Sequence, residues 1–223
     1  MKTAIITGTS RGIGYELANF LLEKDYFVLG ISRTGNDITH PNYTHQNLDV
    51  RDTDKIDSLI NQLECKIDLF INNAGVFRQG PIENFLNEDV NLIIDTNLIS
   101  PIHITKSVIG KLSDSSQIVF VNSVAGLYNF QNQSVYCASQ HALTSFAKIL
   151  GKELRPKRVR VCSLHLGGVN TTFYGDYNPY PFGDITQAIE TKEINRAIEL
   201  IINTPDWIDM STIELFPMIE WHG

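Results

Sequence analysis

The chain has 223 residues, of which 43% are hydrophobic and 19% charged, so it can bury the core of one folded domain covering 1–223. Its formal net charge is −7, which excludes a broadly basic face for nucleic acid or anionic lipid. No apolar run is long enough to span a membrane, and a strand-like run begins at residue 3, where a signal peptide would otherwise lie. We therefore expect a cytoplasmic protein with no nucleic-acid or membrane partner.

Strand-like and helix-like segments alternate along the whole chain. The apolar runs predict strands over 3–7, 26–32, 44–50, 67–73, 116–123, 158–166 and 211–216. Apolar residues at helical spacing predict helices over 12–25, 52–64, 87–112, 133–154 and 186–203, with a kink or break near Pro101. This alternation indicates an α/β fold, a single doubly wound Rossmann-type domain with a mostly parallel seven-stranded sheet and helices on both faces.

The three cysteines are Cys65, Cys137 and Cys162. Their spacing matches no metal motif, and their odd number does not suggest a disulfide framework. All three lie in apolar runs, so we expect buried free thiols in a reducing compartment, and no metal site.

The stretch "ITGTSRGIG" (6–14) joins the first predicted strand to the first helix. Gly8 can make the tight turn, Gly12 allows a pyrophosphate to approach the backbone, and Gly14 allows helix and strand to pack closely. The free N–H groups of a helix N-terminus favour phosphate. The predicted phosphate-binding residues are Gly8, Thr9, Ser10, Arg11, Gly12, Ile13 and Gly14.

The end of the second predicted strand indicates which dinucleotide binds. An NAD site places a carboxylate there, but this strand ends in Ser32 and Arg33, and Asp37 lies further out. Arg11 and Arg33 would instead suit a ribose 2′-phosphate, because the guanidinium is a permanent, planar phosphate ligand. We therefore predict NADP(H) as the cofactor.

Further motifs follow in a set order: an Asp-Val pair, an Asn-Asn-Ala-Gly run, a helix asparagine, a strand-end serine and a helix tyrosine. They are Asp49 and Val50, then Asn72, Asn73, Ala74 and Gly75, then Asn97, Ser123 and Tyr136. With the glycine-rich loop, this set resembles the short-chain dehydrogenase/reductase family nearly end to end. The resemblance implies that Asn97, Ser123 and Tyr136 are catalytic. It further implies cofactor contacts from Asp49, Val50, Asn73, Ala74, Gly75, Tyr136, Gly168, Val169 and Thr171.

Two positions depart from the family pattern. Leu166 replaces the proline that precedes a turn beside the nicotinamide, and Gln140 replaces a lysine four residues after Tyr136. Gln140 can still donate to the nicotinamide ribose, but it cannot supply the positive charge that lowers the pKa of the tyrosine. Losing about 2–3 pKa units of tuning would cost about 3–4 kcal/mol, or roughly 10²- to 10³-fold in rate.

No other basic side chain is an obvious replacement for the lysine. Lys148 lies about 18 Å further along the same helix, and His141 projects about 100° around it from Gln140. His165, at the end of the sixth strand, is the better candidate, although a packed histidine without a chemical role is the more common case.

The segment 166–186 is predicted to form the substrate loop. It carries five aromatic residues, namely Phe173, Tyr174, Tyr177, Tyr180 and Phe182, and the stretch 124–133 adds Leu127, Tyr128 and Phe130. These side chains suit an apolar or aromatic carbonyl substrate, and equally suit a subunit interface. The family resemblance implies a homodimer or homotetramer formed through the long helical tract and the helix of Tyr136.

The sequence thus predicts an NADP-dependent oxidoreductase that interconverts a carbonyl and an alcohol, with weakened acid/base tuning. Tyr136 would be the acid/base, Ser123 would orient the carbonyl, Asn97 would support the local network, and Gln140 would hold the ribose. Two alternatives stay open because of Gln140. The first is that the protein is an NADP(H)-binding pseudoenzyme, sensor or non-redox relative. The second is that the glutamine is an introduced substitution.

Overall fold

The computed structural model describes residues 1–175, 180 and 183–220. Seven strands form one sheet in the order β3-β2-β1-β4-β5-β6-β7, and every neighbouring pair is parallel. The strands are β1 (Lys2–Thr7), β2 (Tyr26–Ser32), β3 (Tyr43–Asn47), β4 (Ile67–Asn72), β5 (Leu112–Ser123), β6 (Arg160–Leu166) and β7 (Thr212–Leu215). The α-helices are α1 (Gly12–Glu23), α2 (Thr53–Gln62), α3 (Asn87–Ile94), α4 (Ser100–Ile109), α5 (Ser134–Leu154) and α6 (Thr191–Asn203).

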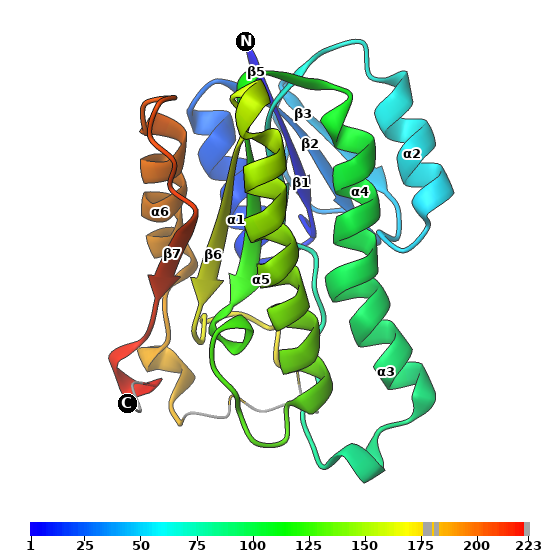
Figure 1. Ribbon diagram of the computed structural model, residues 1–223, viewed down its shortest axis with the longest axis vertical. Coiled ribbons are helices and arrows are strands. Elements are labelled where there is room, and N and C mark those ends of the chain that lie inside the picture. Colours follow the sequence, from blue (N-terminus) through cyan, green and yellow to red (C-terminus); the bar gives the residue numbers. More distant parts are fainter. Residues whose placement is uncertain (176–179, 181–182, 221–223) are drawn as a thin grey trace.

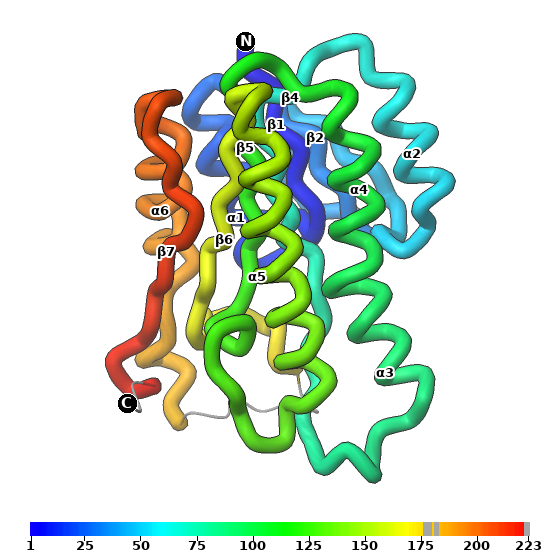
Figure 2. The backbone as a smooth tube through the Cα atoms, in the orientation of Figure 1, coloured from blue at the N-terminus to red at the C-terminus, as the bar shows by residue number. Residues whose placement is uncertain are grey.

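Helices cover both faces of the sheet (Figures 1 and 2), which confirms the predicted doubly wound α/β fold. On one face, α1 and α6 pack their buried side chains, such as Leu17 and Ile198, against the sheet. On the other face, α2, α4 and α5 do the same with side chains such as Ile56, Ile104 and Leu143. The inner strands β1, β2 and β4 read as continuous apolar runs because both of their faces are buried, whereas the edge strands β3 and β7 are only partly buried.

The strand order places the site. β1 pairs with β2 on one side and with β4 on the other, so the direction of winding reverses at β1. A crevice opens at such a switch point, outside the carboxyl ends of the strands. In Figure 1 these ends point downward, toward the loops that follow β4, β5 and β6 and toward the C-terminal segment.

Some predicted boundaries were wrong. The helical tract predicted over 87–112, with a kink or break near Pro101, is α3, a π-helical turn (Asp95–Ile99) and α4, which ends at Ile109. Pro101 lies in the first turn of α4, where a missing N–H costs little, and the irregularity precedes it. The helix predicted from 186 begins only at Thr191, after a separate 3₁₀ turn (Ile185–Gln187).

The prediction that all three cysteines are buried was wrong for Cys65. All three are free thiols, but Cys65 is exposed, whereas Cys137 and Cys162 are buried. Cys65 lies in the short connection between α2 and β4, beyond the last turn that packs on the sheet. Within the described part of the chain, no helix is long and apolar enough to cross a membrane.

Candidate active site

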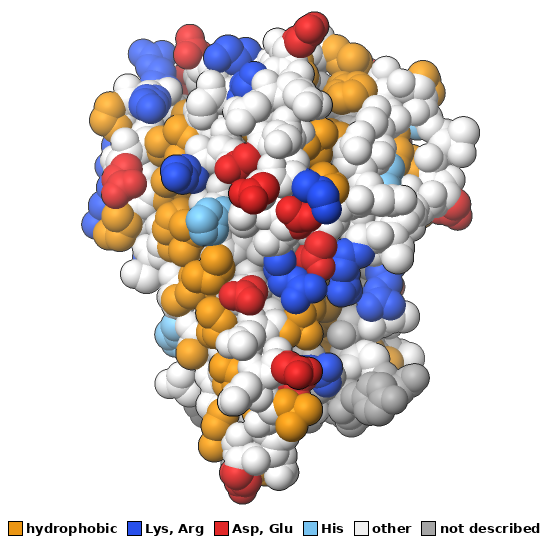
Figure 3. Space-filling view, turned by 90° about the vertical axis from the view of Figure 1, so that its right-hand side faces the viewer, with side chains coloured by type: hydrophobic (Ala, Val, Ile, Leu, Met, Phe, Trp, Pro, Cys, Tyr) orange, Lys and Arg blue, Asp and Glu red, His pale blue; other side chains and the backbone are white. Residues whose placement is uncertain are grey.

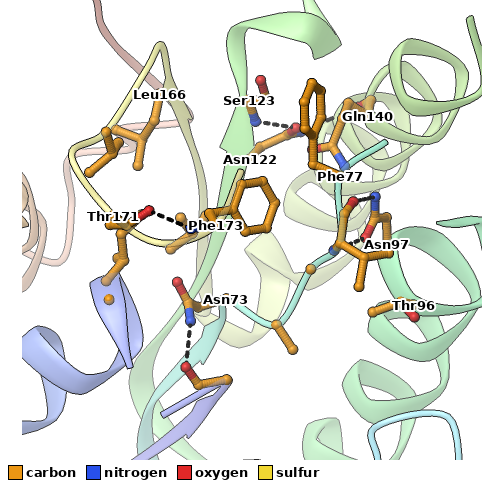
Figure 4. Close-up of a pocket in the computed structure, with 18 of the residues that line it drawn as sticks. Asn73, Phe77, Thr96, Asn97, Asn122, Ser123, Gln140, Leu166, Thr171 and Phe173 are labelled. Carbon is orange, nitrogen blue, oxygen red and sulfur yellow. Dashed lines mark hydrogen bonds between the residues drawn. The ribbon is translucent and has the colours of Figure 1, made fainter. Parts of the chain in front are cut away.

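A cavity of about 700 Å³ lies at the carboxyl ends of the strands. It is lined by the β1–α1 loop, the ends of β2, β4 and β5, helix α5, the π-helical turn and the segment after β6, and Figure 4 shows side chains from several of these elements around it. Of the predicted catalytic and cofactor-binding residues, all line this cavity except Thr9 and Gly14. The predicted site residues, which are far apart in the sequence, therefore meet in one place.

The β1–α1 loop has the backbone geometry that its glycines permit. Gly8 and Gly12 have φ values of +77° and +59°, a region that other residues rarely adopt. A Cβ on Gly14 would collide with the carbonyl oxygen of Gly8, so this glycine is needed where α1 packs against the loop. Thr9 is fully buried behind the loop, with its hydroxyl 3.5 Å from Nδ1 of His45.

The loop is braced by the segment after β4. The hydroxyl of Thr7 accepts hydrogen bonds from the backbone N–H groups of Asn73 (2.9 Å) and Ala74 (3.0 Å). The Asn73 side-chain amide donates to the carbonyls of Thr7 (2.9 Å) and Gly8 (3.2 Å). Asn73 lines the cavity, but its amide is directed at the β1–α1 loop, as Figure 4 shows. It therefore holds the loop in shape.

Three arginines line the cavity near β2 and β3, namely Arg11, Arg33 and Arg51. Sequence analysis identified the first two and missed Arg51, although it directly follows the Asp49-Val50 pair. The Arg51 guanidinium lies 2.7 Å from the Asp49 carboxylate, and this contact, with Arg33 nearby, holds the pKa of Asp49 below its ordinary value. The positive charge at this end exceeds the negative charge of Asp49.

Ser123 and Tyr136 meet at the opposite end of the cavity. Ser123 is the last residue of β5, and its backbone N–H donates to Oδ1 of Asn122 (2.6 Å). Tyr136 lies in the first turn of α5, and its phenol group faces the same end of the cavity as Ser123, close enough for the serine hydroxyl to lower the pKa of the phenol. The Tyr136 ring stands edge-on to Phe77, with 4.9 Å between centroids. A carbonyl oxygen placed between the two hydroxyls would meet two hydrogen-bond donors.

Burial sets the ionisation of Tyr136. Its exposed fraction is 8%, and burial raises its pKa to about 12, against the smaller lowering effect of the Ser123 hydroxyl. Gln140 lies one helical turn later, is buried and lines the same cavity. Its neutral amide offers no positive charge to oppose the effect of burial. The phenol therefore stays protonated across the neutral range.

Asn97 is turned into the site by the π-helical turn between α3 and α4. Its side-chain oxygen accepts from the backbone N–H of Val76, and its amide donates to the Val76 carbonyl, both at 2.9 Å. The amide also lies 3.4 Å from the Ser139 hydroxyl of α5. Asn97 therefore ties the segment after β4 to the helix that carries Tyr136.

The candidate substitutes for the missing lysine do not reach the cavity. His165 is fully buried and donates from Nδ1 to the carbonyl of Ser123 (3.0 Å), and burial lowers its pKa. His141 donates from Nδ1 to the carbonyl of Cys137 one turn earlier (3.0 Å), and Lys148 is exposed. Neither these residues nor any Lys side chain belongs to the described lining.

Aromatic side chains line the end of the cavity that holds Ser123 and Tyr136, here called the candidate catalytic end. Phe173 and Tyr174, from the segment after β6, line the cavity and pack around Phe77, with centroids 6.2 Å and 5.6 Å from it. Tyr177 and Phe182 lie outside the described residues. Phe130 also lines the cavity, whereas Leu127 does not, and Tyr128 is directed instead at Glu214 and Phe216. Of the three residues of 124–133 that were predicted to lie on the substrate side, only Phe130 lines the cavity.

Sequence analysis missed two groups of polar residues. The Asn122 side chain contacts the Thr144 hydroxyl (3.0 Å) and so joins the end of β5 to α5. Glu220, in the turn after β7, is buried and lines the cavity. In the sequence, an Asn within an apolar strand, directly before the candidate serine, indicated a role for Asn122. No sequence motif indicated a role for Glu220.

The geometry agrees with comparisons to known proteins. The family model "short chain dehydrogenase" matches residues 2–180. The 3-oxoacyl-(acyl-carrier-protein) reductase of Buchnera aphidicola subsp. Schizaphis graminum is 30% identical over 210 residues, covering 89% of this chain and 86% of that protein.

Solved structures share the fold. A serine dehydrogenase complexed with NADP+ superposes with a TM-score of 0.90 at 22% identity, covering 99% of this chain and 96% of that chain. Carveol dehydrogenase from Mycobacterium avium, in complex with NAD, superposes with a TM-score of 0.84 at 21% identity, covering 97% and 96%. The match to the family model over most of the sequence, with the fold and the assembled site, shows that this chain belongs to the short-chain dehydrogenase family of oxidoreductases.

Proposed function

We propose that the protein is an NADP-dependent oxidoreductase that interconverts a carbonyl and an alcohol. The observation that supports this most directly is that Ser123 and Tyr136 lie together in the same cavity as the glycine-rich loop. One end of the cavity offers backbone and cationic groups for a dinucleotide. The other end offers two hydroxyls for the oxygen of a small substrate.

The residues present fit a bound nicotinamide dinucleotide. Gly8 and Gly12 open the β1–α1 loop toward the cavity at positive φ, and the N-terminus of α1 follows directly. Helix N-termini bind phosphate through free N–H groups and the helix dipole. Arg11, Arg33 and Arg51 would hold a ribose 2′-phosphate, which supports NADP over NAD.

When bound, the reduced cofactor supplies a hydride to the carbonyl carbon of the substrate. Ser123 donates a hydrogen bond to the carbonyl oxygen, and Tyr136 gives this oxygen its proton, which yields the alcohol. In the reverse direction, Tyr136 must lose its proton before it can accept one from the alcohol. The raised pKa of Tyr136 therefore suits the reductive direction at neutral pH.

Side chains around the catalytic end favour an apolar or aromatic substrate. Phe77, Phe130, Phe173 and Tyr174 line this end, and the described lining there has no Lys or Arg that would anchor a carboxylate or phosphate. Relatives named as 3-oxoacyl-(acyl-carrier-protein) reductases make 3-oxoacyl thioesters a further class to test.

Gln140 supports a second candidate function, that of an NADP(H)-binding protein without useful redox turnover. The two candidates differ in one measurement. NADPH oxidation is followed against aliphatic and aromatic aldehydes and ketones and 3-oxoacyl thioesters, for the natural chain and for Gln140→Lys, after both are shown to bind NADPH. Turnover by the natural chain supports the oxidoreductase. Turnover by Gln140→Lys alone supports the binding protein.

We further propose that two or four copies of the chain associate. Figure 3 shows a hydrophobic strip running down the face turned toward the viewer, and α5 and the π-helical turn expose Ile149 (50%) and Ile99 (39%). Light scattering after size exclusion should give a dimer or tetramer mass, and Ile149→Asp should shift it toward the monomer. A monomer at micromolar concentration contradicts this proposal.

A further inference from the structure

Glu220 is a buried carboxylate at the cavity that the proposed mechanism does not use. It ends the 3₁₀ turn Met218–Glu220 after β7 and has an exposed fraction of 3%. Both of its oxygens lie 2.8 Å from the backbone N–H of Gly168, and the Tyr180 hydroxyl donates to Oε1. The carboxylate therefore joins the C-terminal segment to the segment that follows β6.

The turn after β6 is shaped around this carboxylate. A Cβ on Gly167 would press on Oε2 of Glu220, and a Cβ on Gly168 would collide with Oε1. Neither glycine has a positive φ, so packing against Glu220, together with Pro217 beside Gly167 and Tyr180 beside Gly168, accounts for the missing side chains, rather than backbone conformation. Both glycines line the cavity together with Glu220.

Glu220 lies at the catalytic end of the cavity. Leu166 pairs in register with Ser123, so Gly167 and Gly168 follow directly beside the end of β5. Tyr174 lies within electrostatic range of both Tyr136 and Glu220, and both contribute to the raised pKa of Tyr174, after burial as the largest cause. The Glu220 charge therefore acts on Tyr174, which packs on the same Phe77 ring as Tyr136.

This charge has no counter-ion among the residues described. No Lys, Arg or His in the described ranges forms an ion pair with Glu220, and Gln140 is neutral. Burial raises the pKa of Glu220, while the hydrogen bonds from Tyr180 and Gly168 oppose this rise. Donated N–H and O–H bonds stabilise the anion, because an ionised carboxylate can only accept.

The two redox forms of the nicotinamide ring differ in charge: the oxidised ring is a cation and the reduced ring is neutral. A poorly screened anion nearby stabilises the first and not the second. Resting on the function proposed above, we propose that Glu220 makes the site selective for the oxidised cofactor and thereby biases the bound reactants toward carbonyl reduction. The neutral amide of Gln140 acts in the same sense, because a lysine there would repel the cationic ring.

Direct binding measurements test this proposal without turnover. Dissociation constants for NADP+ and NADPH are measured by calorimetry for the natural chain, Glu220→Gln and Glu190→Gln. Glutamine keeps the size and a hydrogen-bond acceptor but removes the charge. We expect Glu220→Gln to raise the dissociation constant for NADP+ about tenfold and that for NADPH by less than about twofold. Glu190 is the matched control, because it is exposed and bonds Asn170 of the same segment (3.0 Å), so its charge is screened and neither constant should move.

The outcomes separate the possible roles of Glu220. If Glu220→Gln weakens the binding of NADP+ and NADPH equally, Glu220 only holds the turn. If neither dissociation constant changes, the Glu220 charge does not act on the cofactor. Either result overturns the inference and leaves the proposed function standing, whereas failure of the natural chain to bind either form removes the proposed function. If Glu220→Gln does not fold, Glu220→Asp replaces it, and the ratio of its dissociation constants for NADP+ and NADPH must equal that of the natural chain. The natural chain must also bind NADP+ at least as tightly as NADPH. A tenfold preference of the natural chain for NADPH contradicts the inference.

Discussion

The two ends of the cavity differ in how closely they follow the pattern of the family. At the end formed by the β1–α1 loop, the candidate phosphate end, Gly8, Gly12 and Gly14 have the turn geometry and close packing that the motif requires. At the catalytic end, Ser123 and Tyr136 are in place, but Gln140 replaces the charged residue, and Glu220 adds a buried carboxylate. The comparison teaches that the parts that shape a site and the parts that set its proton affinities can change independently.

The largest expected effect comes from removing the acid at the catalytic end. Tyr136→Phe keeps the ring packed on Phe77 but removes the proton donor, so NADPH-dependent reduction should fall about 10³-fold. Because the phosphate end is untouched, the dissociation constant for NADPH should stay within about twofold of its natural value. Steady-state rates and cofactor titration measure the two quantities. A variant that retains most of its activity would remove Tyr136 from its proposed role.

The pH dependence of the two reaction directions should differ for the same reason. Reduction needs Tyr136 protonated, a form that persists up to its pKa of about 12, so the reductive rate should be flat through the neutral range. Alcohol oxidation needs the deprotonated form, so its rate should rise about tenfold per pH unit from pH 7 upward. In Gln140→Lys the added charge should lower the pKa and bring the oxidative rate to a plateau at lower pH. An oxidative plateau near neutral pH in the natural chain would contradict this explanation.

A smaller effect concerns the packing of the phosphate end. Gly14→Ala places a methyl group against the Gly8 carbonyl and should lower the free energy of unfolding by about 1–3 kcal/mol. Gly110→Ala is the matched control, because its φ is −69° and a Cβ there would meet no heavy atom within 4 Å. This control should be neutral or slightly stabilising. Denaturant unfolding of both variants makes the comparison, and equal losses would show that Gly14 is not packed as described.

The smallest expected effect is at the arginines. Arg33→Ala should raise the dissociation constant for NADPH about tenfold and leave that for NADH nearly unchanged, because only NADPH carries the 2′-phosphate. Arg155, in the turn before β6, is a suitable control, since it is exposed and paired with Asp209. If Arg33→Ala raised the dissociation constants for NADPH and NADH equally, Arg33 would not contact the 2′-phosphate specifically.

Much of the fold was predictable because its strands, helices and turns follow from short, local sequence patterns. Apolar runs marked most of the strands, and Gly8 and Gly12 marked a turn that adopts positive φ. The exposure of Cys65 and the start of α6 at Thr191 were not predictable, because the end of a helix depends on what it packs against. The π-helical turn before Pro101 likewise depends on the Asn97 contacts with Val76, which lies 21 residues away.

The candidate site was predictable where a motif places a residue at the end of a strand, as for Ser123 and Asn73. Glu220 follows no such rule. Its partners Gly168 and Tyr180 lie 52 and 40 residues away in the chain, and the three meet only because β7 pairs with β6 at the edge of the sheet. A buried carboxylate of this kind becomes visible only when the chain is folded.

The central claim is that Tyr136 keeps its proton because no cation replaces the missing lysine. Its most direct test is an NMR pH titration of the protein with ¹³Cζ-labelled tyrosine, in which Tyr136→Phe assigns the signal. With a pKa of about 12, the Tyr136 resonance should show no deprotonation shift below about pH 10, and Gln140→Lys should move the midpoint downward. A natural-chain midpoint near pH 7–8, where an unperturbed tyrosine with a pKa of about 10 would still be protonated, would contradict this account.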